Sequence, residues 1–263
     1  MARFPALFIS HGAPSIALEE DDYTRALRGF ATGLPSPTAI VVVSAHWEDS
    51  GPVRVNVNPR PPLIYDFSGF PDALYRLTYP APGAPALGRE VAGLLTGAGL
   101  SPALEPSRGW DHGLWVPLRI AFPEARTPVV EVSLPRLREP EALLAVGQAL
   151  APLRERSVLL LGSGGIVHNL GRMRLDDKAA PAEEWARAFD EWMRERLLGM
   201  DIEAIKAYRQ MAPQAALAVP TSEHFDPTFF VLGSRAKGDG VATVYEGWHY
   251  GSLSMRTFAL VSP

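Results

Sequence analysis

The sequence predicts an α/β fold: a single domain, residues 1–263, with a largely parallel central sheet flanked by helices. Short apolar strand patterns alternate with helical patterns, which is typical of parallel sheets whose strands are covered on both faces. No internal repeat, low-complexity tract or linker divides the chain. In such sheets ligands bind outside the carboxyl ends of the strands, so we expect the functional site at that edge.

Four segments have the character of buried strands, and three of them are rich in β-branched residues. These segments are residues 4–10, 38–45, 127–134 and 157–162. Helical patterns lie at residues 84–98, 139–154 and 181–198. The last of these begins with a proline and two glutamates, as helices often do, and the spacing of its aromatic side chains indicates core packing.

Two further stretches are less regular. Residues 51–80 are rich in proline, tyrosine and phenylalanine and predict a long loop, and long ordered loops in compact domains are usually functional. Residues 241–261 predict a hairpin that turns at Gly247 or Gly251.

The composition excludes several classes of function. A net charge of −4 gives no reason to expect nucleic acid or an anionic membrane as a partner. The chain has no cysteine, so a metal site would have to use histidine and carboxylate ligands. No stretch has the length of a membrane span or the form of a signal peptide, and we expect a cytoplasmic protein.

Three of the six histidines follow predicted strands, namely His11, His46 and His168, while His112 and His224 lie in loop-like contexts. Because the carboxyl ends of parallel strands share one edge of a sheet, we expect the first three to lie there together. A group of neutral imidazoles suits Fe(II) or Zn(II) better than Mg²⁺ or Ca²⁺. The HExxH, GxSxG and phosphate-loop motifs are absent, so zincin, α/β-hydrolase and nucleotide-binding functions are unsupported.

Six motifs in order give the chain a resemblance to a known family: SHGAPS, VVVSAHWE, IYDFSGFPDALYRLTYPAPG, RGWDHGLWVPL, GSGGIVHNL and TSEHFDP. Together they closely resemble the class III extradiol ring-cleavage dioxygenases (LigB-like), and within them the DODA-type branch of 4,5-DOPA dioxygenase extradiol-like proteins. The resemblance spans nearly the whole chain.

The resemblance implies a non-haem metal centre that holds Fe(II), or Zn(II) as found after purification. His11, His46 and His224 resemble the metal ligands. His168 resembles the histidine over the open face of the metal, which acts as acid and base or, in a resting zinc form, as a fourth ligand. His112 resembles a second catalytic histidine of the substrate pocket.

The third ligand position stays open between Glu223 and His224. The best-known enzymes of the class complete a two-histidine, one-carboxylate triad with a glutamate. Adjacent residues of an extended segment point to opposite sides, so one of the two is expected to face the metal. The DODA-type pattern favours His224.

The implied activity is extradiol cleavage of a catechol, a DOPA-like aromatic diol, with O₂ as co-substrate. His168 is the candidate acid/base, since an imidazole can accept and release a proton near neutral pH. Tyr65, Phe67 and Trp115 are expected to line a slot for the aromatic ring.

The residues next to these candidates have supporting roles in this interpretation. Asp111 is expected to cap the following helix. Arg108 is a candidate to attract a substrate carboxylate, but a surface position is favoured for it. Ser10 and Ser44 are expected to help orient the imidazoles. His249 stays open between a supporting and a structural role.

Two alternative functions remain open from the sequence: a Memo-type non-catalytic binding protein, and a zinc-dependent hydrolase. The partners expected are a small-molecule catechol and O₂, with no nucleic acid and no membrane, and self-association into a homo-oligomer is left open. The sequence does not indicate which catechol is used or which carbon–carbon bond breaks.

Overall fold

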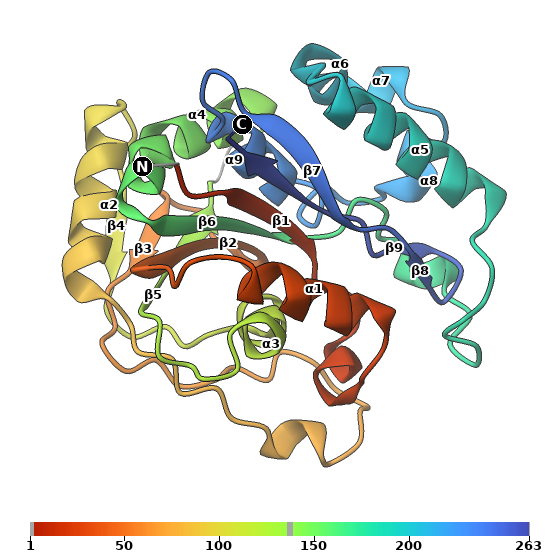
Figure 1. Ribbon diagram of the computed structural model, residues 1–263, viewed down its shortest axis with the longest axis horizontal. Coiled ribbons are helices and arrows are strands. Elements are labelled where there is room, and N and C mark those ends of the chain that lie inside the picture. Colours follow the sequence, from red (N-terminus) through yellow and green to blue (C-terminus); the bar gives the residue numbers. More distant parts are fainter. Residues whose placement is uncertain (1–2, 136–138, 263) are drawn as a thin grey trace.

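An eight-stranded sheet with the strand order β4-β3-β5-β2-β6-β1-β10-β7 runs through the molecule (Figure 1). The computed structural model describes residues 3–135 and 139–262. The strands of this sheet are β1 (Ala6–Ser10), β2 (Ala39–Glu48), β3 (Arg54–Asn56), β4 (Ala103–Glu105), β5 (Val129–Leu134), β6 (Val158–Gly164), β7 (Gly240–Tyr245) and β10 (Thr257–Val261). The predicted α/β class is confirmed.

The centre of the sheet is parallel. β6 pairs in parallel with β1 and with β2, and β2 pairs in parallel with β5. The register places Ser10 beside Gly164 and Ser44 beside Ser163. The carboxyl ends of β1, β2 and β6 therefore meet at one edge of the sheet, where the sequence predicts the site. Antiparallel pairing occurs on both sides of this centre: β10 pairs in this way with β1 and β7, and β3 pairs in this way with β5.

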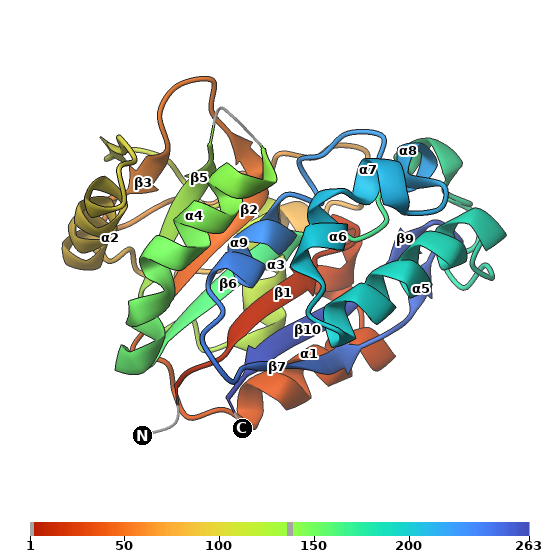
Figure 2. The ribbon, with the colours of Figure 1, turned by 90° about the horizontal axis from the view of Figure 1, so that it is seen from above.

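Helices cover both faces of the sheet (Figures 1 and 2). One face packs against α1 (Asp22–Thr32) and α3 (His112–Ala121), and the other against α2 (Pro85–Gly97), α4 (Pro140–Leu150), α5 (Glu184–Leu198) and α9 (Pro227–Gly233). Side chains of β2 alternate between the two cores, with Ile40 and Val42 on the α1/α3 side and Val41 and Val43 on the other. This double burial explains why the strand patterns are apolar throughout.

The remaining elements are short. They are the helices α6 (Ile202–Lys206), α7 (Tyr208–Met211) and α8 (Ala215–Ala218), and 3₁₀ turns at Pro14–Leu18, Leu74–Arg76, Ala151–Arg156 and Leu170–Arg172. A separate hairpin consists of β8 (Trp248–His249) and β9 (Leu253–Ser254).

The four predicted strands and three predicted helices are all present, with differences at their ends. The helix predicted over 139–154 ends at Leu150 and continues as a 3₁₀ turn, because Pro152 lacks the N–H that another α-helical turn requires. The helix predicted from residue 181 begins at Glu184, since the Glu183 N–H bonds to the carbonyl of Gly251. The predicted loop 51–80 contains β3, which is too short to show strand periodicity. The hairpin predicted over 241–261 is confirmed as the antiparallel pair β7–β10, and the shorter pair β8–β9, whose turn includes Gly251, lies between its strands.

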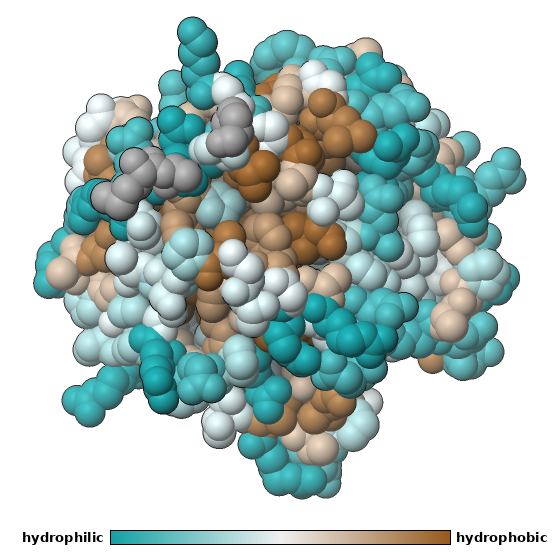
Figure 3. All heavy atoms as spheres, viewed as in Figure 1, coloured by the Kyte–Doolittle hydropathy of each residue, from teal (hydrophilic) through white to brown (hydrophobic). Residues whose placement is uncertain are grey.

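On the face seen in Figure 1, the hydropathy of the side chains differs between the periphery and the middle. Hydrophilic side chains dominate the periphery of this face, and apolar side chains are concentrated nearer its middle (Figure 3). Among the described residues, no helix combines the length and apolar character that crossing a membrane requires.

A buried arginine ties several chain segments together at the amino-terminal edge of the sheet. The Arg154 guanidinium donates to the carbonyls of Phe4, Ser234 and Leu260 and to Asp239 Oδ2 at 2.6 Å, and both charged side chains are 0% exposed. Each of these acceptors belongs to a different part of the chain. This one side chain therefore anchors the start of β1, the end of α9 and the end of β10.

Replacing this arginine by methionine should destabilise the fold strongly. Arg154→Met leaves the buried Asp239 carboxylate short of a partner, and we expect the free energy of unfolding in urea to fall by about 3–5 kcal/mol. The control is Arg156→Met, which removes an exposed ion pair with Glu90 and should cost less than about 1 kcal/mol. Equal effects for the two variants would contradict the anchoring role.

Candidate metal centre and aromatic pocket

Five of the six histidines gather at the carboxyl edge of the sheet. The ring centroids of His11, His46 and His224 lie 4.9–5.2 Å from one another. One nitrogen from each of these three rings lies within 4.8 Å of the others, a grouping that can hold a metal ion. His112 and His168 lie beside the group, with centroids 4.0 Å from His46 and 3.5 Å from His224, respectively.

The ring of His11 is fixed by a serine on the neighbouring strand. His11 follows β1 and is 1% exposed, and its Nδ1 lies 3.0 Å from Ser163 Oγ. The Ser163 hydroxyl donates its proton to the carbonyl of Gly113 at 2.5 Å, so its oxygen accepts from His11 Nδ1–H. The Nε2 of His11 is then the unprotonated nitrogen. It lies 3.1 Å from His46 Nε2.

A single carboxylate holds the rings of His46 and His112. Asp66 Oδ1 accepts from the backbone N–H of His112 at 3.0 Å and from its Nδ1 at 2.9 Å, while Oδ2 lies 3.4 Å from His46 Nδ1. Burial alone would raise the pKa of Asp66, but the hydrogen bonds from the side chain and backbone of His112 lower it below its usual range. Asp66 is therefore a carboxylate that accepts from His112 Nδ1–H and faces the Nδ1 of His46, so the Nε2 atoms of both rings point away from it.

The close approach of His224 depends on glycines at the end of β6. The Gly165 N–H donates to the carbonyl of His224 at 2.8 Å, and a Cβ on Gly164 would lie 2.0 Å from the same carbonyl oxygen. Glu223 Oε1 accepts from His224 Nδ1 at 3.1 Å and from the Thr221 hydroxyl at 2.7 Å. Burial would raise the pKa of Glu223, but these hydrogen bonds lower it to about 2. In this geometry Glu223 orients His224, and His224 faces the other histidines.

The environment favours the neutral form of three of the imidazoles, those of His11, His46 and His168. Burial lowers the pKa of His11 well below its usual range, and the neighbouring histidines lower it further. Burial and the nearby His112 likewise lower the pKa of His46. Burial and the stacked ring of His224 lower the pKa of His168. Neutral imidazole is the form that binds metal ions.

A cavity of about 400 Å³ opens above the histidines. All five histidines of the site and Asp66 contribute to its lining, together with apolar residues. Its apolar lining residues are Gly12, Ala13, Pro14, Phe67, Phe70, Leu170, Met173, Leu175 and Leu253. The volume lies within the range of roughly 300–1,000 Å³ found for small-molecule sites.

Of the three aromatic residues predicted to line the substrate slot, only Phe67 does so, with its ring edge-on to His112 at 5.5 Å. Trp115 is 0% exposed and donates to the carbonyl of Ile64, because α3 turns its side chain into the core. The Tyr65 hydroxyl donates to the carbonyl of Leu77, and its ring packs against Phe67. The prediction is therefore wrong for Tyr65 and Trp115. Their rings pack against Phe67 instead.

Asp111 caps α3 as predicted, accepting from the Leu114 N–H. The surface assignment of Arg108 is wrong. Its guanidinium donates to Asp111 Oδ2 at 2.9 Å and to the carbonyl of His46, and it stacks on Trp47. Buried Glu131 lies 3.6 Å from Arg108, and burial together with Asp111 raises the pKa of Glu131 well above its usual range. This charged cluster fixes the end of β2, from which His46 projects.

The hydrogen bonds of Ser10 and Ser44 differ from those expected of residues that orient the imidazoles. The Ser10 hydroxyl donates to the carbonyl of Arg256, and the Ser44 hydroxyl donates to Asp111, so neither is bonded to an imidazole. Ser163 has the role expected of them, and its sequence context gives no sign of it. His249 is buried outside the cavity lining with Nε2 3.5 Å from Asp21, which is a structural position.

The chain matches the family model described as the catalytic LigB subunit of aromatic ring-opening dioxygenase over residues 5–256. The chain belongs to this LigB family. It is 37% identical to 4,5-DOPA dioxygenase extradiol of Beta vulgaris over 260 residues, which cover 97% of this chain and 96% of the relative. It is 38% identical to the Escherichia coli K12 protein of the same name over 256 residues, which cover 96% and 93%.

A crystal structure of an uncharacterized Escherichia coli K12 protein has the same fold. The TM-score is 0.83 at 32% identity, with 98% of this chain and 99% of the other covered. This LigB-family chain is thus an aromatic ring-opening dioxygenase. Membership of this family supports neither of the two alternative functions, that of a non-catalytic binding protein and that of a zinc hydrolase.

The histidine group of this LigB-family chain fits a metal ion by its donor chemistry. Bonds of about 2.0–2.1 Å to nitrogen place two ligands of one ion about 3 Å apart, and the Nε2 atoms of His11 and His46 are 3.1 Å apart. Each Nδ1 faces an oxygen acceptor, as in most metal-binding histidines. His168 stands outside the three-nitrogen group, stacked on His224.

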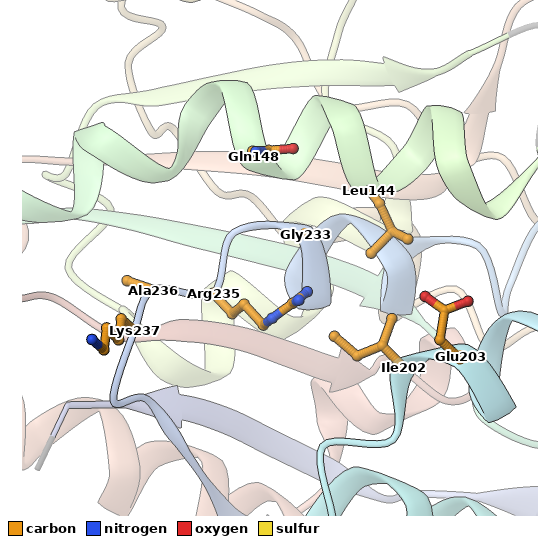
Figure 4. Close-up of a pocket in the computed structure, with 8 residues that line it drawn as sticks. All are labelled: Leu144, Gln148, Ile202, Glu203, Gly233, Arg235, Ala236 and Lys237. Atoms are coloured by element: carbon orange, nitrogen blue, oxygen red, sulfur yellow. The ribbon is translucent and has the colours of Figure 1, made fainter.

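A second cavity, of about 360 Å³, has a different character (Figure 4). It is lined by Gln148 from α4, by Glu203 from α6 and by Arg235 and Lys237 after α9, and no histidine takes part. Of these two cavities, only the first is lined by histidines.

Removing the acceptor behind His11 should weaken metal binding without abolishing it. We expect Ser163→Ala to lower metal affinity by about 10–100-fold, because His11 loses the partner that fixes its tautomer and orientation. Zinc affinity measured against a chromogenic chelator tests this. Ser10→Ala is the control, since that hydroxyl bonds to a carbonyl; an equal loss in both variants would assign the effect to general destabilisation.

Two separate variants test whether Glu223 or His224 is the third metal ligand. His224→Ala should leave the protein with substoichiometric metal, whereas Glu223→Gln should retain metal with an affinity lowered about 10–100-fold. Metal content after dialysis is the measurement. Loss of metal in Glu223→Gln alone would reverse the assignment.

Proposed function

We propose that this chain cleaves the ring of a catechol with O₂ in an extradiol reaction that depends on a non-haem metal ion held by His11, His46 and His224. One observation carries the proposal: three imidazoles converge, each with its Nδ1 facing an oxygen acceptor, beneath an apolar cavity. Fe(II) is the ion proposed for catalysis, and Zn(II) suits the same donors. Bound Fe(II) would supply coordination positions for the two catechol oxygens and for O₂.

Proton movement is assigned to the two histidines beside the ligands. His168, carried by the segment after β6, is proposed as the base that takes a catechol proton and as the acid that later returns it. The Nδ1–H of His112 is held by Asp66, so its Nε2 is available to accept a hydrogen bond from a substrate hydroxyl.

The aromatic ring of the substrate is positioned by apolar contacts. Phe67 stands edge-on to His112, and Phe70 packs edge-on against Phe67 at 5.5 Å. These rings would guide a catechol so that its hydroxyls point toward the histidines, and they would exclude water from the reacting atoms. The relatives are named for DOPA, which makes DOPA one catechol to test on this chain.

The central test is anaerobic loading with Fe(II), followed by addition of a panel of catechols and then O₂. We expect a yellow ring-opened semialdehyde to form from at least one of them, with O₂ consumed one to one with the catechol. If the stoichiometrically loaded protein cleaved none of the catechols, the proposal would be wrong. Turnover of esters or amides by the zinc form without O₂ would favour the hydrolase alternative.

Replacing His168 separates chemistry from metal binding. His168→Gln should keep its metal and lose about 10²–10⁴-fold in kcat, as expected when an acid/base group is removed. His11→Ala is the contrasting variant and should lose both metal and turnover. An empty site in His168→Gln would require His168 to be reclassified as an essential ligand.

A further inference from the structure

The outer part of the site cavity is lined by apolar side chains. Phe67 and Phe70 come from the segment between β3 and α2, and Leu170, Met173 and Leu175 come from the segment after β6. The polar side chains of the lining are the five histidines and Asp66. Within the described part of the chain, no arginine or lysine belongs to this lining.

Three basic side chains of neighbouring segments are engaged elsewhere. Arg108 is bound to Asp111, and Arg174 Nε lies 3.6 Å from Glu183 Oε1. Lys178 Nζ donates to Glu19 and, at 2.6 Å, to Asp21. Arg172 is exposed and lies outside the lining. Basic side chains do line a cavity of this protein, but it is the one in Figure 4.

A charged substituent on the catechol would therefore be poorly accommodated. A carboxylate in this cavity would meet apolar groups and the Asp66 carboxylate, and burying an unpaired charge is strongly unfavourable. An alkyl or aryl substituent would instead displace water from the Phe67, Phe70 and Met173 side chains. Each methylene buried in this way strengthens binding by about fourfold.

We propose that the substrate of this site is a catechol with an uncharged, apolar substituent rather than one bearing a carboxylate or an amino-acid group. The proposal rests on the proposed function, because it assigns the substituent of a ring whose two hydroxyls that function directs to the histidines. The chemical class is a 4-alkyl- or 4-arylcatechol. The segments that recognise the substituent are residues 67–70 and 170–175.

The test is calorimetric binding to the zinc-loaded protein, which reports recognition without turnover. The probes are 4-propylcatechol, dopamine, 3,4-dihydroxyphenylpropionate and DOPA, whose side chains are similar in length and differ in charge. We expect 4-propylcatechol to bind at least about tenfold more tightly than the propionate and DOPA. Equal or tighter binding of the propionate or DOPA would overturn the proposal, as would failure of all four to bind.

A charge added at the cavity mouth gives a second, independent readout. Leu175→Arg should strengthen binding of 3,4-dihydroxyphenylpropionate by about two- to fivefold and leave 4-propylcatechol unimproved. Leu198→Arg is the matched control, since Leu198 is also an exposed leucine but lies at the end of α5, outside the lining. If Arg172→Ala weakened the propionate selectively, Arg172 would be its carboxylate partner and the proposal would be wrong.

Ring cleavage is measured separately with the Fe(II) form and the same four catechols. Binding in the expected order without any cleavage would support the substituent preference and contradict the proposed function. Cleavage with DOPA preferred over 4-propylcatechol in kcat/KM would support the proposed function and contradict the preference.

Discussion

The structure of the site depends on the close approach of two imidazole nitrogens that both carry lone pairs. The Nε2 atoms of His11 and His46 lie 3.1 Å apart, and both Nδ1 atoms face oxygen acceptors, Ser163 and Asp66. Two lone pairs at this distance repel each other unless a cation lies between them. The acceptors favour the tautomers that create this requirement, and a bound metal ion would satisfy it. Much of the surrounding fold serves to hold these atoms in place.

The backbone arrangement follows from that requirement. The parallel register of β1, β6 and β2 brings His11 and His46 to one edge, and Gly164 and Gly113 leave room for His224 and for the ring of His46. Behind β2, the cluster of Arg108, Asp111 and Glu131 is buried and charged, which is costly to form. Its bonds reach the backbone of His46 and the start of α3, so it fixes the relative position of two histidine-bearing segments.

Sequence reasoning could predict those parts of the site that local pattern determines. His11 and His46 follow apolar strand patterns, and parallel strands share one carboxyl edge, so their proximity was predictable. Ser163 and Asp66 act across 152 and 46 residues of sequence, and no local pattern encodes such contacts. Trp115 was misassigned because an aromatic residue near a pocket motif does not reveal which side of its helix faces the core. The strands β3 and β4 have three residues each, too few to show a period of two.

In the proposed function, the edge of the sheet carries the reacting groups, and the loops carry the groups that recognise the substituent. In the proposed reaction the histidines and their acceptors would act on the two hydroxyls that every catechol shares, and many of these residues lie in or next to β1, β2 and β6. In the proposed binding mode the substituent, which distinguishes one catechol from another, would contact residues 67–70 and 170–175, which lie in loops and a short 3₁₀ turn. Loops accept sequence change at little cost to stability. A different substrate can therefore be selected by altering these two segments while the metal-binding edge stays unchanged, and the name of a relative indicates the reaction more securely than the substituent.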